Sequence, residues 1–112
     1  MDLEWIRRVC LALPAASESV QWGNDLVFKV GGKIFAVGSL EPGESALTIK
    51  CTPDDFADLI ERPGCSPARY LKRGEWITLQ TFDALPAKEI LRLVRQSYDI
   101  IVSKLPRKSR PA

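Results

Sequence analysis

Apolar and polar positions alternate on either side of a glycine pair in the stretch LVFKVGGKIFAV, residues 26–37. Strict alternation is typical of a β-strand with one buried face. Gly31 and Gly32 both tolerate the positive φ that a two-residue hairpin turn requires. The pattern therefore predicts an antiparallel hairpin centred on these two glycines.

The register of this hairpin assigns its side chains to faces. If Val30 pairs with Lys33 across the turn, Phe28 lies opposite Phe35 and both rings belong in the core. Lys29 then projects from the opposite, solvent-facing side. We expect Lys33 at the turn end of the core face, where its stem covers the apolar edge and its ammonium reaches water.

Other periodicities predict the remaining elements. Helical spacing of apolar residues indicates three helices, at residues 2–13, 52–61 and 86–105. Alternating runs predict strands at 46–50 and 76–82, and a short extended piece lies at 20–22. This order gives an α+β fold, a two-layer sandwich in which an antiparallel sheet of four to five strands carries the N-terminal, middle and long C-terminal helices on one face.

The size and charge of the chain refine this picture. With 112 residues, 46% of them hydrophobic, the chain has the length of one domain, which we place at residues 1–105, and residues 106–112 form a basic tail expected to be loose. Residues 1–103 carry 12 basic and 14 acidic side chains, whereas the remainder adds four basic ones and no acid. The basic tail could add affinity for phosphate if a nucleic acid were nearby.

Several function classes are disfavoured by composition. The sequence has no histidine, which removes the commonest general base and transition-metal ligand. It has no phosphate-binding glycine motif, nucleotide fingerprint or metal-ligand spacing, so we expect neither a cofactor nor a metal. A lysine-activated hydroxyl built from Ser97 or Tyr98 is conceivable, but the helical stripe explains Tyr98 as a core aromatic. We therefore expect a protein without enzymatic activity.

Localisation follows from similar observations. The three cysteines form no CxxC pair, and their odd number fits reduced thiols better than a disulfide framework. No apolar run is long enough for a membrane span, and MDLEWIRR lacks the pattern of a signal peptide. We expect a cytoplasmic protein, with no membrane partner and with a monomer as the favoured state.

Four strings in this order, FKVGGKIFA, LTIKCTPDDF, PARYLKRGEWITL and SYDIIVSKLP, together resemble the MmcQ/YjbR-like family of small bacterial proteins. The resemblance covers residues 2–105. It implies a CyaY-like (frataxin-like) or secretion-chaperone-like α+β fold, and a DNA-binding role with a "double wing" arrangement of hairpins. The positions that match the family motif are Lys29, Gly32, Lys33, Phe35, Lys50, Tyr70, Leu71, Trp76, Ser97 and Tyr98.

The leading functional hypothesis is therefore DNA binding through a sheet face and hairpin wing. If the helices cover the face with the two phenylalanines, basic and aromatic side chains share the uncovered face, as phosphate contact and base stacking would require. The candidate residues are Lys29, Lys33, Lys50, Arg69, Tyr70, Lys72, Arg73 and Trp76.

Two alternatives remain open. The sheet face or a free strand edge could bind a partner protein, since unpaired edges accept an added strand. Frataxin-like iron binding would need an acidic ridge, and the available acids are spread over a turn and a helix, which makes this option weaker. DNA binding is favoured slightly over partner-protein binding.

Overall fold

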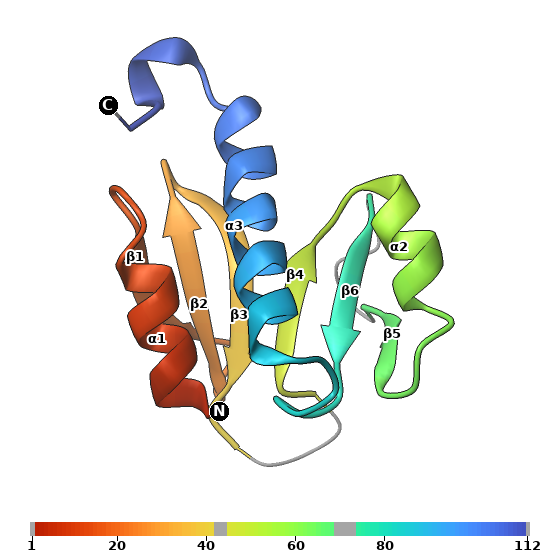
Figure 1. Ribbon diagram of the computed structural model, residues 1–112. Coiled ribbons are helices and arrows are strands. Elements are labelled where there is room, and N and C mark those ends of the chain that lie inside the picture. The colour runs from red at the N-terminus through yellow and green to blue at the C-terminus, as the bar shows by residue number, and fades with distance from the viewer. Residues whose placement is uncertain (1, 42–44, 69–73, 112) are drawn as a thin grey trace.

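The computed structural model describes residues 2–41, 45–68 and 74–111. Within them, six antiparallel strands form one sheet in the order β1-β2-β3-β4-β6-β5, with helices packed against one face (Figure 1). The helices are α1 (Leu3–Leu11), α2 (Pro53–Leu59), α3 (Ala87–Ser103) and a 3₁₀ turn, η1 (Arg107–Ser109). The strands are β1 (Ser17–Gln21), β2 (Asp25–Val30), β3 (Lys33–Ser39), β4 (Leu47–Lys50), β5 (Cys65–Pro67) and β6 (Trp76–Leu79).

The predicted α+β class and one-sided helical layer are confirmed, but the sheet is larger than the four to five strands expected. The strand β1 was expected only as a short extended piece, and no strand was predicted where β5 lies. Both are edge strands with mostly exposed side chains. Neither strand has the alternating apolar residues on which the prediction depends. Each is a strand because it forms hydrogen bonds with its neighbour, not because one of its faces is buried.

The hairpin of β2 and β3 forms as predicted near its turn, but its register then changes. Val30 pairs with Lys33 and Lys29 with Ile34, as expected. The expectation that Phe28 lies opposite Phe35 is wrong, because β3 contains one extra residue and Phe28 pairs with Ala36. Both rings still reach the core, with centroids 6.4 Å apart.

All three α-helices contribute to a single core over one face of the sheet. From α1 come Ile6 and Cys10, and from α2 comes Leu59. The long helix α3 contributes the largest set, which is Ile90, Leu93, Val94, Tyr98 and Ile101. The middle helix is capped as its sequence suggests, since the Thr52 hydroxyl accepts a bond from the backbone N–H of Asp55 at 3.2 Å.

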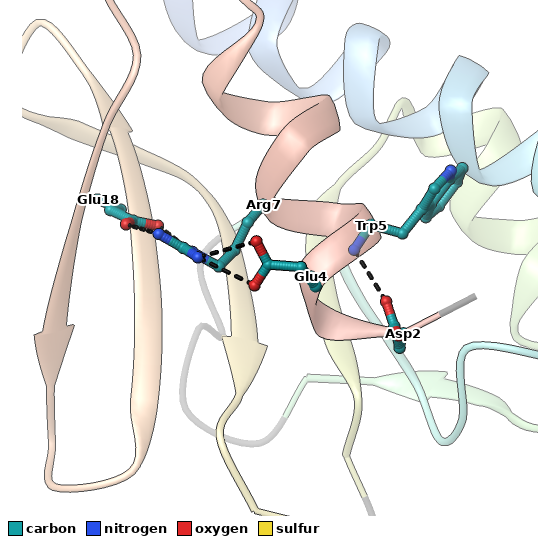
Figure 2. Close-up of polar contacts among 5 residues, drawn as sticks. All are labelled: Asp2, Glu4, Trp5, Arg7 and Glu18. Atoms are coloured by element: carbon teal, nitrogen blue, oxygen red, sulfur yellow. Dashed lines mark hydrogen bonds and ion pairs between the residues drawn. The ribbon is translucent and has the colours of Figure 1, made fainter.

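An arginine on α1 fastens the edge strand β1 to the helical layer (Figure 2). The Arg7 guanidinium donates to both carboxylate oxygens of Glu18, from Nε at 2.9 Å and from Nη2 at 2.5 Å. Its third nitrogen donates to Glu4 at 3.0 and 3.1 Å. The same helix is capped by Asp2, whose Oδ1 accepts from the Trp5 N–H at 2.9 Å. The edge strand is thus held by a two-carboxylate ion pair as well as by its ladder to β2.

A buried serine joins α3 to the sheet where β3 leaves its regular register. Ser97 is fully buried, and its hydroxyl donates to the Phe35 carbonyl at 2.5 Å. The same hydroxyl accepts the backbone N–H of Lys50 at 3.0 Å. One side chain therefore satisfies a carbonyl of β3 and an N–H of β4, two strands that are no longer bonded to each other at this point.

No helix in the described ranges is both long enough and apolar enough to cross a lipid bilayer.

Candidate nucleic-acid interface

The turn of the β2–β3 hairpin packs directly against the chain that follows α3. Gly31 has a φ of +57°, and a Cβ placed there would lie only 2.6 Å from Cδ1 of Leu105. Leu105 itself is 3% exposed. Glycine is therefore required at position 31 both for its backbone conformation and for this close approach. The packing fixes the C-terminal segment against the hairpin turn.

The segment beyond α3 folds back on the helix end. After Pro106, residues Arg107–Ser109 form one 3₁₀ turn. The Arg110 guanidinium then donates to the carbonyls of Leu105 and Ser103, each at 3.0 Å. In the structure this segment makes a turn and two hydrogen bonds to the end of the helix, and the expectation of a loose tail stays a prediction.

These interactions bring basic residues from two distant parts of the sequence to the same end of the molecule (Figure 1). We call this region the basic end and define it by Lys29, Lys33, Lys104, Arg107, Lys108 and Arg110. All except Lys29, which is half-buried, are exposed. No acidic residue occurs between Ile100 and Pro111, so the C-terminal part of this surface carries a single sign of charge.

Lys50 and Trp76 were expected to be exposed to solvent on one face of the sheet. This expectation is wrong, because both side chains are buried. Lys50 is only 6% exposed and Trp76 only 8%. The two residues pair across β4 and β6, and the Lys50 ammonium lies 5.6 Å from the centre of the Trp76 ring. Gly74 lies so close that a Cβ there would be 2.1 Å from Lys50 Nζ.

The environment of Lys50 disfavours its charge. Burial lowers the pKa of this ammonium, the positive charge of Lys104 lowers it further, and Glu75 opposes the shift. A buried cation beside another cation is a poor binding point for a solvated polyanion. Lys50 therefore belongs to the interior of the sheet edge, not to the basic end.

We expect Lys50→Met to stabilise the fold by about 1 kcal/mol at neutral pH, because it removes a desolvated charge and leaves a side chain that packs on Trp76. The pKa of Lys50 is lowered in the folded state, so the unfolded chain binds more protons and the penalty fades as pH rises through the folded pKa. Urea denaturation of both proteins at pH 7 and in alkaline buffer measures this. A Met variant less stable than the parent at pH 7 would contradict it.

The remaining predicted residues divide into two groups. Arg69, Tyr70, Lys72 and Arg73 lie outside the described residues. Ser97 and Tyr98 have structural bonds: Ser97 joins α3 to the sheet, and the Tyr98 hydroxyl donates to the Pro14 carbonyl at 2.5 Å.

The C-terminal basic residues were not among the predicted site residues. Leu105 was predicted on the apolar stripe of the last helix, and the glycine pair was predicted as a turn. Neither pattern shows that Leu105 and the glycine pair, more than 70 positions apart in the sequence, are in contact.

Thiol and metal chemistry find little support in the described ranges. The three cysteines are buried and free, and burial raises the pKa of the Cys10 thiol to about 12 and of the Cys51 thiol to about 11. Within the described residues, no three Cys, Asp or Glu side chains gather closely enough to hold a metal ion.

Fold and surface together define a small α+β protein with a one-sided helical layer over a six-stranded sheet. Residues 11–100 match the family model described as YjbR, and the chain belongs to the YjbR family. The Escherichia coli K12 protein YjbR, described as uncharacterized, is 29% identical over 98% of this chain and 95% of its own length. The uncharacterized protein YbdF of Escherichia coli O157:H7 is 24% identical over 96% of this chain and 89% of its own.

Two solved structures have the same architecture. A crystal structure of a Deinococcus radiodurans protein with a DUF419 domain superposes with a TM-score of 0.85 at 25% identity, covering 96% of this chain and 84% of that one. A Pseudomonas syringae protein gives a TM-score of 0.74 at 21% identity, over 89% of this chain and 98% of its own. The second likeness concerns the fold alone.

Proposed function

We propose that this protein is a non-enzymatic DNA-binding protein that binds the phosphate backbone through its basic end. The observation that carries the proposal is the packing of Leu105 on Gly31, which sets the C-terminal cations beside the hairpin turn. The exposed lysines and arginines there suit phosphate binding, which positions a protein on nucleic acid without reading its sequence. The "double wing" of hairpins that the family resemblance implies supports the same class. The buried free cysteines support a cytoplasmic setting.

The proposal differs from the sheet-face hypothesis in one respect. Because Trp76 is buried, its ring offers DNA bases no stacking surface, and because Lys50 is buried, its ammonium is not a solvated charge that DNA could reach. The basic end contains no aromatic residue. We therefore expect affinity that depends strongly on salt and weakly on base sequence.

The test is a titration of fluorescently labelled duplex DNA at several salt concentrations. Removing one lysine–phosphate interaction lowers the slope of log K against log salt by about 0.9, which corresponds to roughly eightfold in affinity near 0.1 M salt. We expect Lys33→Gln and Lys108→Gln each to weaken binding about 5- to 10-fold by this reasoning.

Two matched variants keep the test specific. Lys88→Gln removes the same charge from the exposed N-terminal end of α3, away from the basic end, and should change affinity less than about twofold. Lys50→Met should likewise leave binding unchanged, whereas the sheet-face hypothesis predicts weaker binding.

Two outcomes would overturn the proposal. If a variant ending at Leu105 loses all binding while Lys33→Gln has no effect, the tail attracts DNA by charge alone and there is no composite surface. If no DNA binds even at low salt, partner-protein binding becomes the leading hypothesis. The edge strand β1 favours that alternative, because an edge strand can pair with a partner strand and its residue Val20 is 59% exposed.

A further inference from the structure

The face of the sheet opposite the helices contains a hollow of about 1120 Å³. Its floor is a row of four residues paired across neighbouring strands, Val37, Thr48, Thr78 and Ser66. Their chain neighbours Leu47, Ile49, Ile77 and Leu79 are fully buried in the core. Because side chains alternate along a strand, the row lies on the face opposite the helices, where Thr48 is 8% exposed.

The floor of the hollow is lined with hydroxyl groups. Thr48 Oγ1 and Thr78 Oγ1 lie 2.8 Å apart and share one hydrogen bond. One of the two hydroxyl protons remains available after that bond is formed, together with lone pairs on both oxygens. Ser66 continues the row toward β5, and Gln80 adds an amide at the side. A ligand on this floor would meet donors and acceptors at the spacing of the strands.

A carboxylate lies in the wall of the same hollow. Asp25, the first residue of β2, is partly buried, and its side chain makes no hydrogen bond to another described residue. Burial raises the pKa of this carboxyl group. A partly desolvated acid with no hydrogen-bond partner among the described residues favours a ligand that donates hydrogen bonds and opposes a phosphate.

The rim holds an aromatic side chain in an unusual backbone conformation. Trp22 has a φ of +55°, in the left-handed region, and the residue is 64% exposed. For a residue other than glycine this conformation costs roughly 1–2 kcal/mol. Glycine would make the same turn at less cost, so the turn does not require an indole there. Trp22 also lines the hollow.

These features exclude two kinds of occupant on chemical grounds. A purely apolar ligand would cover the threonine and serine hydroxyls and leave them unpaired, which is unfavourable. An anionic ligand would approach the Asp25 carboxylate. A neutral ring with hydroxyl groups at its edge and an apolar face satisfies both, since its edge can bond to the floor and its face can lie on an aromatic ring.

We propose that the hollow on the sheet face opposite the helices binds a neutral sugar ring, stacked on Trp22 and hydrogen-bonded to Asp25 and to the Thr48–Thr78 pair. This site lies on the sheet face opposite the helices, whereas the basic end is formed by the hairpin turn and the C-terminal segment. The proposal does not rest on DNA binding, and either can fail without the other.

The experiment is a titration of the ¹⁵N-labelled protein with maltose, cellobiose and N,N′-diacetylchitobiose, and separately with uridine. We expect at least one of these compounds to shift the Trp22 indole resonance together with the amides of Thr48 and Thr78. Shifts with the disaccharides alone assign a saccharide site. Shifts with uridine as well assign the ribose ring as an accepted form of the same chemistry.

Three variants show whether the stated residues bind the ring. Trp22→Gly should abolish the shifts while the melting temperature stays equal or rises, because the backbone strain is relieved. Asp25→Asn should weaken binding at least fivefold. As the matched control, Trp5→Phe changes a tryptophan on α1 that does not line the hollow and should leave binding unchanged.

Two results would overturn the proposal. One is the absence of shifts around the hollow with every compound at tens of millimolar. The other is binding that persists in Trp22→Gly, since the stacking surface would then have no role.

Discussion

Replacing Ser97 with alanine is expected to lower the free energy of unfolding by about 2–4 kcal/mol, because two buried backbone groups lose their partner at once. The Ser97 hydroxyl donates to the Phe35 carbonyl and accepts from the Lys50 N–H, and the residue is fully buried. The site has no solvent to replace either bond. In a domain of this size such a change lowers the melting temperature by roughly 10 °C or more.

Urea denaturation followed by circular dichroism measures this destabilisation. The matched control is Ser103→Ala, on the same helix, where the serine is exposed and donates to the Ile100 carbonyl one turn back. That change should stay within about 0.5 kcal/mol. A destabilisation below about 1 kcal/mol for Ser97→Ala would mean that the backbone groups find other partners.

A still larger effect is expected for Phe35→Ala, at about 3–5 kcal/mol. The ring is fully buried, meets Tyr98 edge-on at 5.3 Å between centroids, and lies 6.4 Å from the Phe28 ring. Its removal opens a cavity in the core and takes one aromatic contact away from each of Phe28 and Tyr98.

The comparison residue for this change is Phe82, which is only partly buried against the same core. Phe82→Ala should cost about half as much or less, since less apolar surface is removed from a site that solvent can reach. Thermal melts of both variants, with near-ultraviolet circular dichroism as a reporter of aromatic packing, provide the measurement. Equal destabilisation in the two variants would contradict the central position assigned to Phe35.

The sequence predicted the helices and the central hairpin because their signals are local. The alternation around the glycine pair and the helical stripe of residues 86–105 depend on residues at most four positions apart in the sequence. Both elements appear in the structure. The register beyond the turn was wrong because an extra residue in β3 shifts Phe28 from Phe35 to Ala36. The extra residue cannot be recognised from the pattern of apolar positions, because Phe35 and Ala36, which follow each other at the irregularity, are both apolar.

The candidate sites were harder to predict than the fold, for a related reason. Alternation placed Lys50 and Trp76 on the face opposite Ile49 and Ile77, but it could not show that both side chains are buried there. Likewise Leu105 and Gly31 were each interpreted correctly as a core residue and a turn residue. Their packing against each other, and hence the basic end, depends on tertiary structure that one sequence without relatives does not display.

The long helix α3 also determines when the chain can fold during synthesis. All six strands have left the ribosome once Leu79 has emerged, yet a large part of the apolar layer that covers them comes from Ile90 to Leu105. Until those residues emerge, the apolar face of the sheet is exposed to solvent. Chaperones and proteases can bind this exposed apolar surface. The nascent protein therefore passes from vulnerable to protected in a single late step, when its last helix docks.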